Sequence, residues 1–288
     1  MNSNEWPLVF FTLLTQISLG IIIAGLLFSL VMKNAETSIP LDLKKLLMVT
    51  ALGCMVVALA ISFFHLATPL HSVYALSNIG TSWLSREILL VSMLAFCLFI
   101  ATSSLHFNVP HRDLFSYLFL AALVVGVILV WSMARIYMIQ TVPLWNTPST
   151  PIAFFNSALM LGGSITLVLM ALYFSKNPDI PDIRQMQNVV FLMIAAAVFI
   201  SLLNMLLIQP DVAAASSGFF SPAVSPWWRH GQLILMLAGF SLLTYWFTLL
   251  PDTQWTASRL IYAGAACLLL AEIMGRYLFY ASYYRVGI

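Results

Sequence analysis

The chain has 288 residues, of which 61% are hydrophobic and only 8% are charged, and its formal net charge is +2. A soluble domain carries roughly 25% charged side chains, so this chain could not cover its own surface in water. The composition excludes a soluble enzyme, a disordered linker and a nucleic-acid-binding protein, since so small a net charge does not attract a polyanion. The mean hydropathy of +0.97 indicates an integral membrane protein.

The start of the chain is expected to be a membrane helix that is retained. A cleavable signal peptide has lysine or arginine before a short apolar run, whereas this chain has Glu5 before an apolar run that is too long. About 20 apolar residues span a bilayer, and continuous runs lack the alternation that β-barrel strands need. We therefore expect one all-α membrane-embedded domain over residues 1–288, with eight transmembrane helices near residues 7–32, 45–66, 84–105, 114–139, 151–175, 187–208, 229–250 and 257–282.

Eight helices place both ends of the chain on one side of the membrane, here called side A, and the opposite side is side B. The arginines toward side A lie at or inside helix ends or in the tail, whereas side B holds every lysine. The basic residues of side B are Lys33, Lys44, Lys45, Arg112, Lys176, Arg184 and Arg259. Because cytoplasmic loops are enriched in lysine and arginine, we expect both termini to lie outside the cytoplasm.

Two long connections on side A, near residues 67–83 and 209–228, are nearly uncharged and carry prolines and aromatic residues. Such connections can be covered by a partner protein. They can also lie in the membrane interface, where tryptophan and tyrosine are enriched. We favour a docked partner and keep the interface as the alternative.

Polar residues inside the spans gather toward side A. Ionisable groups are costly within a membrane, so each one marks a functional hypothesis. Gln16 and Asn204 add uncharged polar groups at similar depth, and the side B halves of the spans carry almost nothing comparable. The sequence predicts one polar pocket near side A, formed by His65, Glu87, Arg135, Tyr137, Glu272 and Arg276.

Structural explanations compete with this prediction. Arg229 and His230 can mark the membrane surface at the start of a span. Glu272 and Arg276 are four residues apart on one helix and can neutralise each other. His65 is harder to explain in this way, because it ends a long apolar run and a histidine titrates near physiological pH.

Neither a metal nor a haem is expected to be bound by this chain. Cys54, Cys97 and Cys267 have no spacing that fits a zinc site or an iron–sulfur cluster. A bis-histidine haem needs two histidines on different helices at one depth, which only His65 and His230 could provide. No second pair exists to carry electrons across the membrane.

A series of short motifs extends from the first span to the eighth, and their order and spacing are more specific than any one of them. The motifs are Glu5-Trp6-Pro7-Leu8, His65-Leu66-Ala67-Thr68-Pro69, Ser77-Asn78-Ile79-Gly80, Ser85-Arg86-Glu87-Ile88, Arg135-Ile136-Tyr137, Thr141-Val142-Pro143-Leu144-Trp145 and Ala271-Glu272-Ile273-Met274-Gly275-Arg276. Together they resemble the DmsC-type membrane anchor subunit of dimethyl sulfoxide reductase.

The resemblance implies a multi-pass protein of the bacterial cytoplasmic (inner) membrane with both termini periplasmic. It implies an anchor that oxidises menaquinol, a four-cluster iron–sulfur subunit of ferredoxin type and a molybdopterin catalytic subunit. It assigns His65 and Glu87 to the quinol site. Arg86 stands where relatives have an uncharged residue, so its role is open between pairing with Glu87 and facing lipid headgroups.

The chemistry expected of this chain is acceptance of protons from menaquinol as its electrons leave. His65 is the expected acceptor, with Glu87 as a second acceptor or as the group that orients it. Arg135 and Tyr137 are expected to hold the quinol oxygens, and the cofactor-binding site is completed by Glu272 and Arg276.

Two alternatives to a dimethyl sulfoxide reductase anchor stay open at this point. The first is the anchor of a related polysulfide or nitrite reductase complex, which does the same redox work for another catalytic partner. The second is a small secondary transporter. Transporters tend to place polar sites near the membrane midplane within inverted repeats, whereas here the polar groups gather at one face and no repeat is found.

Overall fold

The computed structural model describes residues 6–32, 39–65, 76–107, 112–177, 184–207, 226–249 and 258–282. Within these ranges lie eight α-helices that are long and apolar enough to cross a membrane. The helices are α1 (Trp6–Val31), α2 (Leu41–His65), α4 (Trp83–His106), α5 (Arg112–Tyr137), α6 (Ser149–Lys176), α7 (Arg184–Leu207), α9 (Pro226–Leu249) and α10 (Ser258–Ala281), and a 3₁₀-helix, η4 (Leu76–Asn78), precedes α4. The prediction of an all-α fold with eight helices of spanning length is confirmed for the described residues.

Several helices begin before their predicted windows. The helix predicted at residues 45–66 begins at Leu41 in the structure, because Lys44 and Lys45 continue the helix beyond the apolar run. Similarly, α7 begins at Arg184, before its predicted start at residue 187. Polar residues extend a helix at the membrane surface because its backbone bonds do not require apolar side chains, so hydropathy alone misses these turns.

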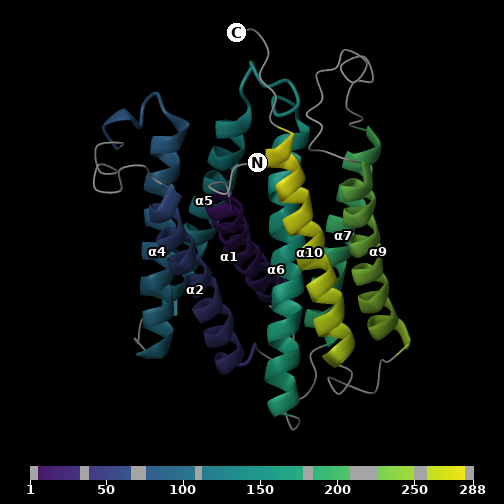
Figure 1. Ribbon diagram of the computed structural model, residues 1–288. Coiled ribbons are helices and arrows are strands. Elements are labelled where there is room, and N and C mark those ends of the chain that lie inside the picture. The colour runs from purple at the N-terminus through teal and green to yellow at the C-terminus, as the bar shows by residue number, and fades with distance from the viewer. Residues whose placement is uncertain are drawn as a thin grey trace.

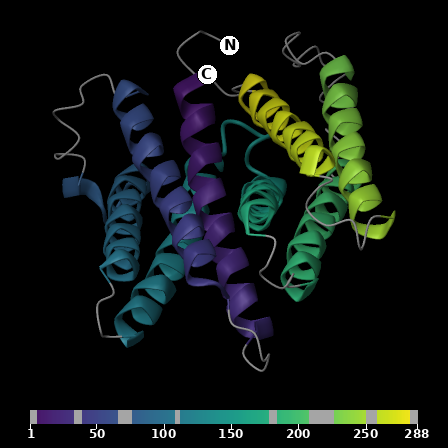
Figure 2. The same ribbon diagram turned by 90° about the horizontal axis from the view of Figure 1, so that it is seen from below.

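The helices stand side by side and alternate in direction (Figure 1). We call α1, α2, α4 and α5 the first half of the bundle, and α6, α7, α9 and α10 the second half. Extensive contacts between α1 and α6 join the two halves. Seen along the bundle, α6 lies between α1 and α10 (Figure 2). The central helices α1 and α6 bury a larger share of their residues than the other six.

The α1–α6 contact depends on small residues. A Cβ atom added to Gly20 would overlap the carbonyl oxygen of Ala158, and one added to Gly162 would overlap the backbone of Gly20. Small residues let membrane helices approach closely, which matters because lipid provides no hydrophobic drive between helices. The two halves therefore meet backbone to backbone.

The first and last helices of the bundle meet on one side. Trp6 at the start of α1 stacks on Tyr277 near the end of α10, with ring centroids 5.8 Å apart. This agrees with the even number of predicted spans, and the shared side is side A.

Candidate functional site

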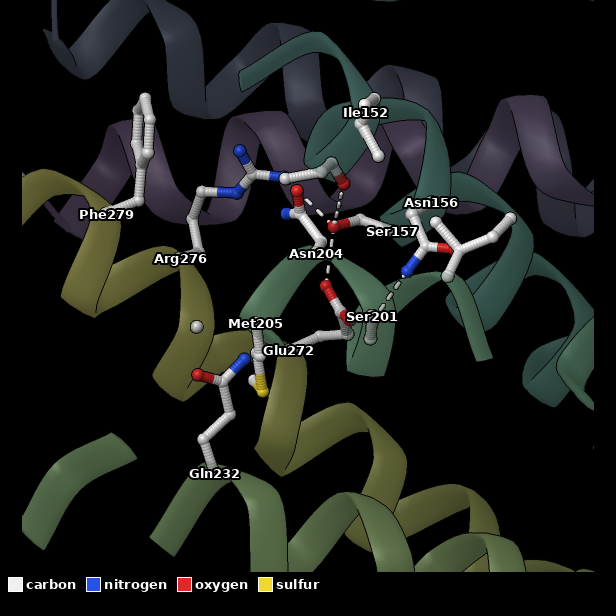
Figure 3. Close-up of a pocket in the computed structure, with 13 residues that line it drawn as sticks. Ile152, Asn156, Ser157, Ser201, Asn204, Met205, Gln232, Glu272, Arg276 and Phe279 are labelled. Atoms are coloured by element: carbon white, nitrogen blue, oxygen red, sulfur yellow. Dashed lines mark hydrogen bonds between the residues drawn. The ribbon is translucent and has the colours of Figure 1, made fainter. Parts of the chain in front are cut away.

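A buried arginine in the side A half of the bundle joins three helices. Arg276 of α10 is only 4% exposed, and its Nη2 donates to the side-chain oxygen of Gln16 in α1 at 2.9 Å. It also donates to the Ser157 hydroxyl of α6 at 3.2 Å, and Ser157 donates to Glu272 Oε2 at 2.5 Å (Figure 3). The structure thus brings Gln16, Glu272 and Arg276 together, and the carboxylate and guanidinium meet through a hydroxyl group.

Aromatic rings also contact this guanidinium. The Cζ atom of Arg276 is 3.9 Å from the ring centroid of Phe154 and 6.0 Å from that of Phe279. A desolvated cation over an aromatic face gains about 2 kcal/mol or more. Hydrogen bonds and ring contacts together compensate for the water that Arg276 loses inside the membrane span.

An aromatic cluster lies beside Arg276, where α5 and α10 end. The Tyr280 hydroxyl donates to the Tyr137 hydroxyl at 3.2 Å, and the Tyr137 ring contacts Trp145, Phe154 and Phe279. Trp145, in the connection after α5, donates its indole N–H to the Phe279 carbonyl oxygen at 2.8 Å. The cluster fixes the position of Tyr137 and fastens this connection to the last helix.

Glu87 is the buried carboxylate of the first half. It lies in the second turn of α4, is 8% exposed, and makes no hydrogen bond to the residues that the structure describes. The hydroxyl groups of Tyr137 and Tyr280 lie in its neighbourhood. A buried ion costs several kcal/mol unless it is paired and hydrogen-bonded. Among the described residues, Glu87 therefore has no donor that offsets this cost.

Arg135 lies apart from these groups, at the side A end of α4 and α5. Its Cζ is 5.5 Å from the ring centroid of Trp83, and Arg86 covers the same ring at 4.3 Å. Arg86 also donates to the backbone oxygens of Ile79 and Gly80 at 2.8 and 2.7 Å. The structure does not bring Arg135 to the Arg276 network. In the structure, Arg86 fastens the η4 connection to α4, and no ion pair joins it to Glu87 among the described residues.

A cavity of about 90 Å³ lies between α6, α7, α9 and α10 (Figure 3). Asn156 donates to Ser201 across it at 2.7 Å, and Ser149 donates to Asn204 at 3.0 Å. Asn204, predicted to share the depth of the polar pocket, belongs to this cavity. Its polar lining comes from all four helices: Asn156, Ser157, Ser201, Asn204, Gln232, Glu272 and Arg276.

Comparison with known proteins identifies the family to which this chain belongs. A family model described as DMSO reductase anchor subunit (DmsC) matches residues 1–282. The chain belongs to this family. The anaerobic dimethyl sulfoxide reductase protein YnfH of Escherichia coli is 27% identical over 292 residues, which cover 99% of this chain and 96% of that protein. The C subunit of anaerobic dimethyl sulfoxide reductase is 28% identical in Escherichia coli, over 59% of this chain and 58% of the relative, and 26% identical in Haemophilus influenzae, over 59% and 61%.

Membership confirms the resemblance that the motifs indicated, and it implies catalytic and electron-transfer partner subunits for this anchor. In this anchor subunit α2 ends at His65, whose side chain lies outside the described part of the protein. The proposed role of His65 therefore stays a prediction. Most of the connections near 67–83 and 209–228 also lie outside the described residues.

Two further expectations bear on the anchor's surface and metal content. Arg229 and His230 are exposed within the first five residues of α9, which agrees with their interpretation as membrane-surface residues. Among the residues that the structure describes, no group of three histidine, cysteine, aspartate or glutamate side chains could hold a metal ion.

Sequence reasoning found Gln16 and Asn204 but missed several other uncharged polar residues of the anchor. Ser157 joins Glu272 to Arg276, and Asn156 and Gln232 line the cavity. Single serine and asparagine residues barely lower the hydropathy of a span, so they do not stand out from it. The signal that could have found the cavity is Asn156, because a carboxamide inside a membrane helix seeks a partner on a neighbouring helix.

Proposed function

We propose that this anchor subunit oxidises menaquinol near side A and passes the electrons to a four-cluster iron–sulfur subunit that supplies a molybdopterin catalytic subunit. Membership in the DMSO reductase anchor family supports this proposal. The observation that carries it is Glu87, a buried carboxylate with no hydrogen bond to the described residues. The hydroxyl groups of Tyr137 and Tyr280 lie near this carboxyl group.

These residues fit a quinol head group by their chemistry. A quinol has two hydroxyl groups that need acceptors and a ring that packs against aromatic and apolar side chains. Glu87 provides an acceptor, and Tyr137 provides a hydroxyl group already positioned by Tyr280. Bound menaquinol supplies two electrons and two protons.

The protein's own residues are proposed to accept and direct the protons. His65 and Glu87 are the proposed acceptors, because a positioned base typically contributes about 10²–10⁴-fold to such a step. Tyr137 and Arg135 are proposed to orient the quinol oxygens. Arg135 would act from the edge formed with Trp83.

Glu272 and Arg276 are proposed to complete the cofactor-binding site by supporting the aromatic cluster. The Phe154 ring contacts the Tyr137 ring at 5.7 Å between centroids and also packs against the Arg276 guanidinium. The network around Arg276 therefore supports the ring that supports Tyr137.

Side A is proposed to be the periplasmic face of a bacterial cytoplasmic (inner) membrane, with the partner subunits docked there. The lysines, all toward side B, support this orientation. A phosphatase reporter that is active only outside the cytoplasm should be active when fused after Ile288. An inactive phosphatase, with a fluorescent cytoplasmic reporter at the same position, would reverse the assignment.

Substitution of the proposed acceptor tests the function. His65→Ala should abolish quinol-driven sulfoxide reduction, whereas complex assembly and reduction driven by an artificial dye should persist, because the catalytic metal belongs to another subunit. His106→Ala, near the side B end of α4, is the matched control and should oxidise quinol at the wild-type rate. A wild-type rate for His65→Ala would exclude His65 and leave Glu87 as the proposed base.

A further inference from the structure

The cavity between α6, α7, α9 and α10 extends inward from side A. Asn204 lies near the end of α7 at Leu207, whereas Glu272 lies well before the end of α10 at Ala281. At about 1.5 Å per residue, these positions are roughly 5 and 13 Å from the side A ends of their helices. Ile152 and Met205 in the lining are 43% and 37% exposed, whereas Glu272 is 8% exposed. The cavity is thus a shaft that leads to a buried carboxylate.

Unpartnered polar atoms line this shaft. The Asn156 side-chain oxygen and the Arg276 Nε are buried without a hydrogen-bond partner in the described part of the protein. Gln232 reaches the shaft because Gly275 leaves room, since a Cβ atom there would collide with the Gln232 amide nitrogen. A buried polar atom without a partner costs about 1–3 kcal/mol. The lining therefore calls for a ligand that both donates and accepts hydrogen bonds.

The volume of the shaft indicates whether a quinone ring or water molecules occupy it. An engineered cavity of about 150 Å³ holds benzene, whereas a water molecule has a share of about 30 Å³ in the liquid and needs two to four polar partners. A shaft of about 90 Å³ is too small to enclose a quinone ring. It has room for several water molecules. Donors and acceptors on its walls supply their partners.

We propose that the shaft is a hydrated proton-binding site, in which Glu272 takes up and releases protons in exchange with water on side A. The carboxylate takes a proton from a hydronium ion in the shaft and returns it to water when the pH on side A rises. The Ser157 hydroxyl accommodates both states, because it lies within reach of two acceptors. Glu272 Oε2 is 2.5 Å away and the Ala153 carbonyl oxygen is 2.9 Å away.

Among the residues that the structure describes, the groups facing Glu272 are uncharged except for Arg276. Arg276 is linked to the Glu272 carboxyl group through the Ser157 hydroxyl. The other helices present carboxamide and hydroxyl groups, namely Gln16 from α1, Asn156 and Ser157 from α6, Ser201 and Asn204 from α7, and Gln232 from α9. Proton uptake therefore removes the counter-charge of Arg276, and the bond from Arg276 to Gln16 extends that change to the first half.

Infrared difference spectroscopy of the whole complex in membranes tests this site. A pH step reveals a carboxyl group that gains or loses a proton by its C=O stretch, and D₂O buffer shifts that stretch to lower frequency if water reaches the group. We expect one such band to shift in D₂O, to vanish in Glu272→Gln and to persist in Glu272→Asp. Glu87→Gln is the matched control, because it removes the other buried carboxyl group of the described residues and should leave this band in place.

A second variant fills the shaft and keeps Glu272. Ser201→Leu should slow deuterium uptake by the band about tenfold or more, because protons would have to pass apolar side chains. Phe199→Leu changes a 61% exposed position on the same helix and should leave uptake unchanged. A band that survives Glu272→Gln, or uptake that Ser201→Leu does not slow, overturns the inference. The measurement follows the carboxyl group itself, so its outcome does not depend on quinol oxidation.

Discussion

Glu87 and Glu272 are buried to the same extent, each 8% exposed, but their surroundings differ. In the second half of the bundle, Glu272 accepts a hydrogen bond from Ser157 and shares a network with Arg276. In the first half, no described residue donates a hydrogen bond to Glu87. Because a buried ion without partners costs several kcal/mol, the contrast separates a carboxylate held in a hydrogen-bonded network from one without a donor among the described residues.

Removal of Arg276, the buried cation of the second half, is expected to have the largest effect, a loss of stability. Arg276→Met leaves Glu272 buried without its counter-charge, and breaking a buried pair in this way costs about 3–5 kcal/mol. Thermal unfolding of the purified complex should show this loss, and the double variant with Glu272→Gln should recover most of it. Wild-type stability of Arg276→Met would mean that the network does not hold the helices together.

The matched change in the first half should affect activity instead of stability. Glu87→Gln removes an uncompensated buried carboxylate, so the free energy of unfolding should not fall. Quinol-driven sulfoxide reduction should slow about 100-fold, the lower end of the contribution of a positioned base. Dye-driven reduction should stay at the wild-type rate. If Glu87→Gln and Glu272→Gln lowered stability equally, the contrast between the two carboxylates would disappear.

The contact that joins the two halves is expected to tolerate no added atom. Gly162→Ala places a Cβ atom against the Gly20 backbone, and overpacking of this kind typically costs about 1–3 kcal/mol. Gly53→Ala is the matched control, because a Cβ atom at Gly53 meets nothing within 4 Å. Unfolding temperatures of the two variants should differ, and equal values would show that the backbone contact is not tight.

The smallest expected effect concerns the arginine at the edge of the first half. Arg86→Ala removes two hydrogen bonds to the η4 connection, and because Arg86 is partly exposed, the loss should be about 1 kcal/mol. Faster proteolytic cleavage near Gly80 would report the released connection. Arg229→Ala, at an exposed position of α9, should leave both stability and cleavage unchanged. Unchanged cleavage in Arg86→Ala would show that Arg86 does not fasten the connection.

The eight spans could be predicted because each is a continuous apolar run, and the depth of the polar residues followed from their place within these runs. Depth does not say which way a side chain points. Arg135 and Tyr137 are two residues apart, which turns them about 200° from each other around α5. Tyr137 therefore enters the aromatic cluster, whereas Arg135 lies over Trp83.

Neighbouring helices could not be predicted from the spans either. Gln16, Glu272 and Arg276 were expected at similar depth, but their connection depends on Ser157, which requires α6 to lie between α1 and α10. That placement follows from the small residues at the α1–α6 contact, which hydropathy does not register. The sequence therefore predicted the members of the network better than its links.

The hydrogen bond of the Trp145 indole can form only late in the synthesis of the protein. Its acceptor on Phe279 lies in α10, which the ribosome synthesises after the other seven described helices. Tyr137 depends on the same helix for its bond with Tyr280. While the middle helices enter the membrane, the connection after α5 therefore has neither fastening. Insertion of the final helix is the event that completes the aromatic cluster, so a nascent polypeptide that stops before Phe279 would contain Glu87 and Tyr137 without the contacts that position Tyr137.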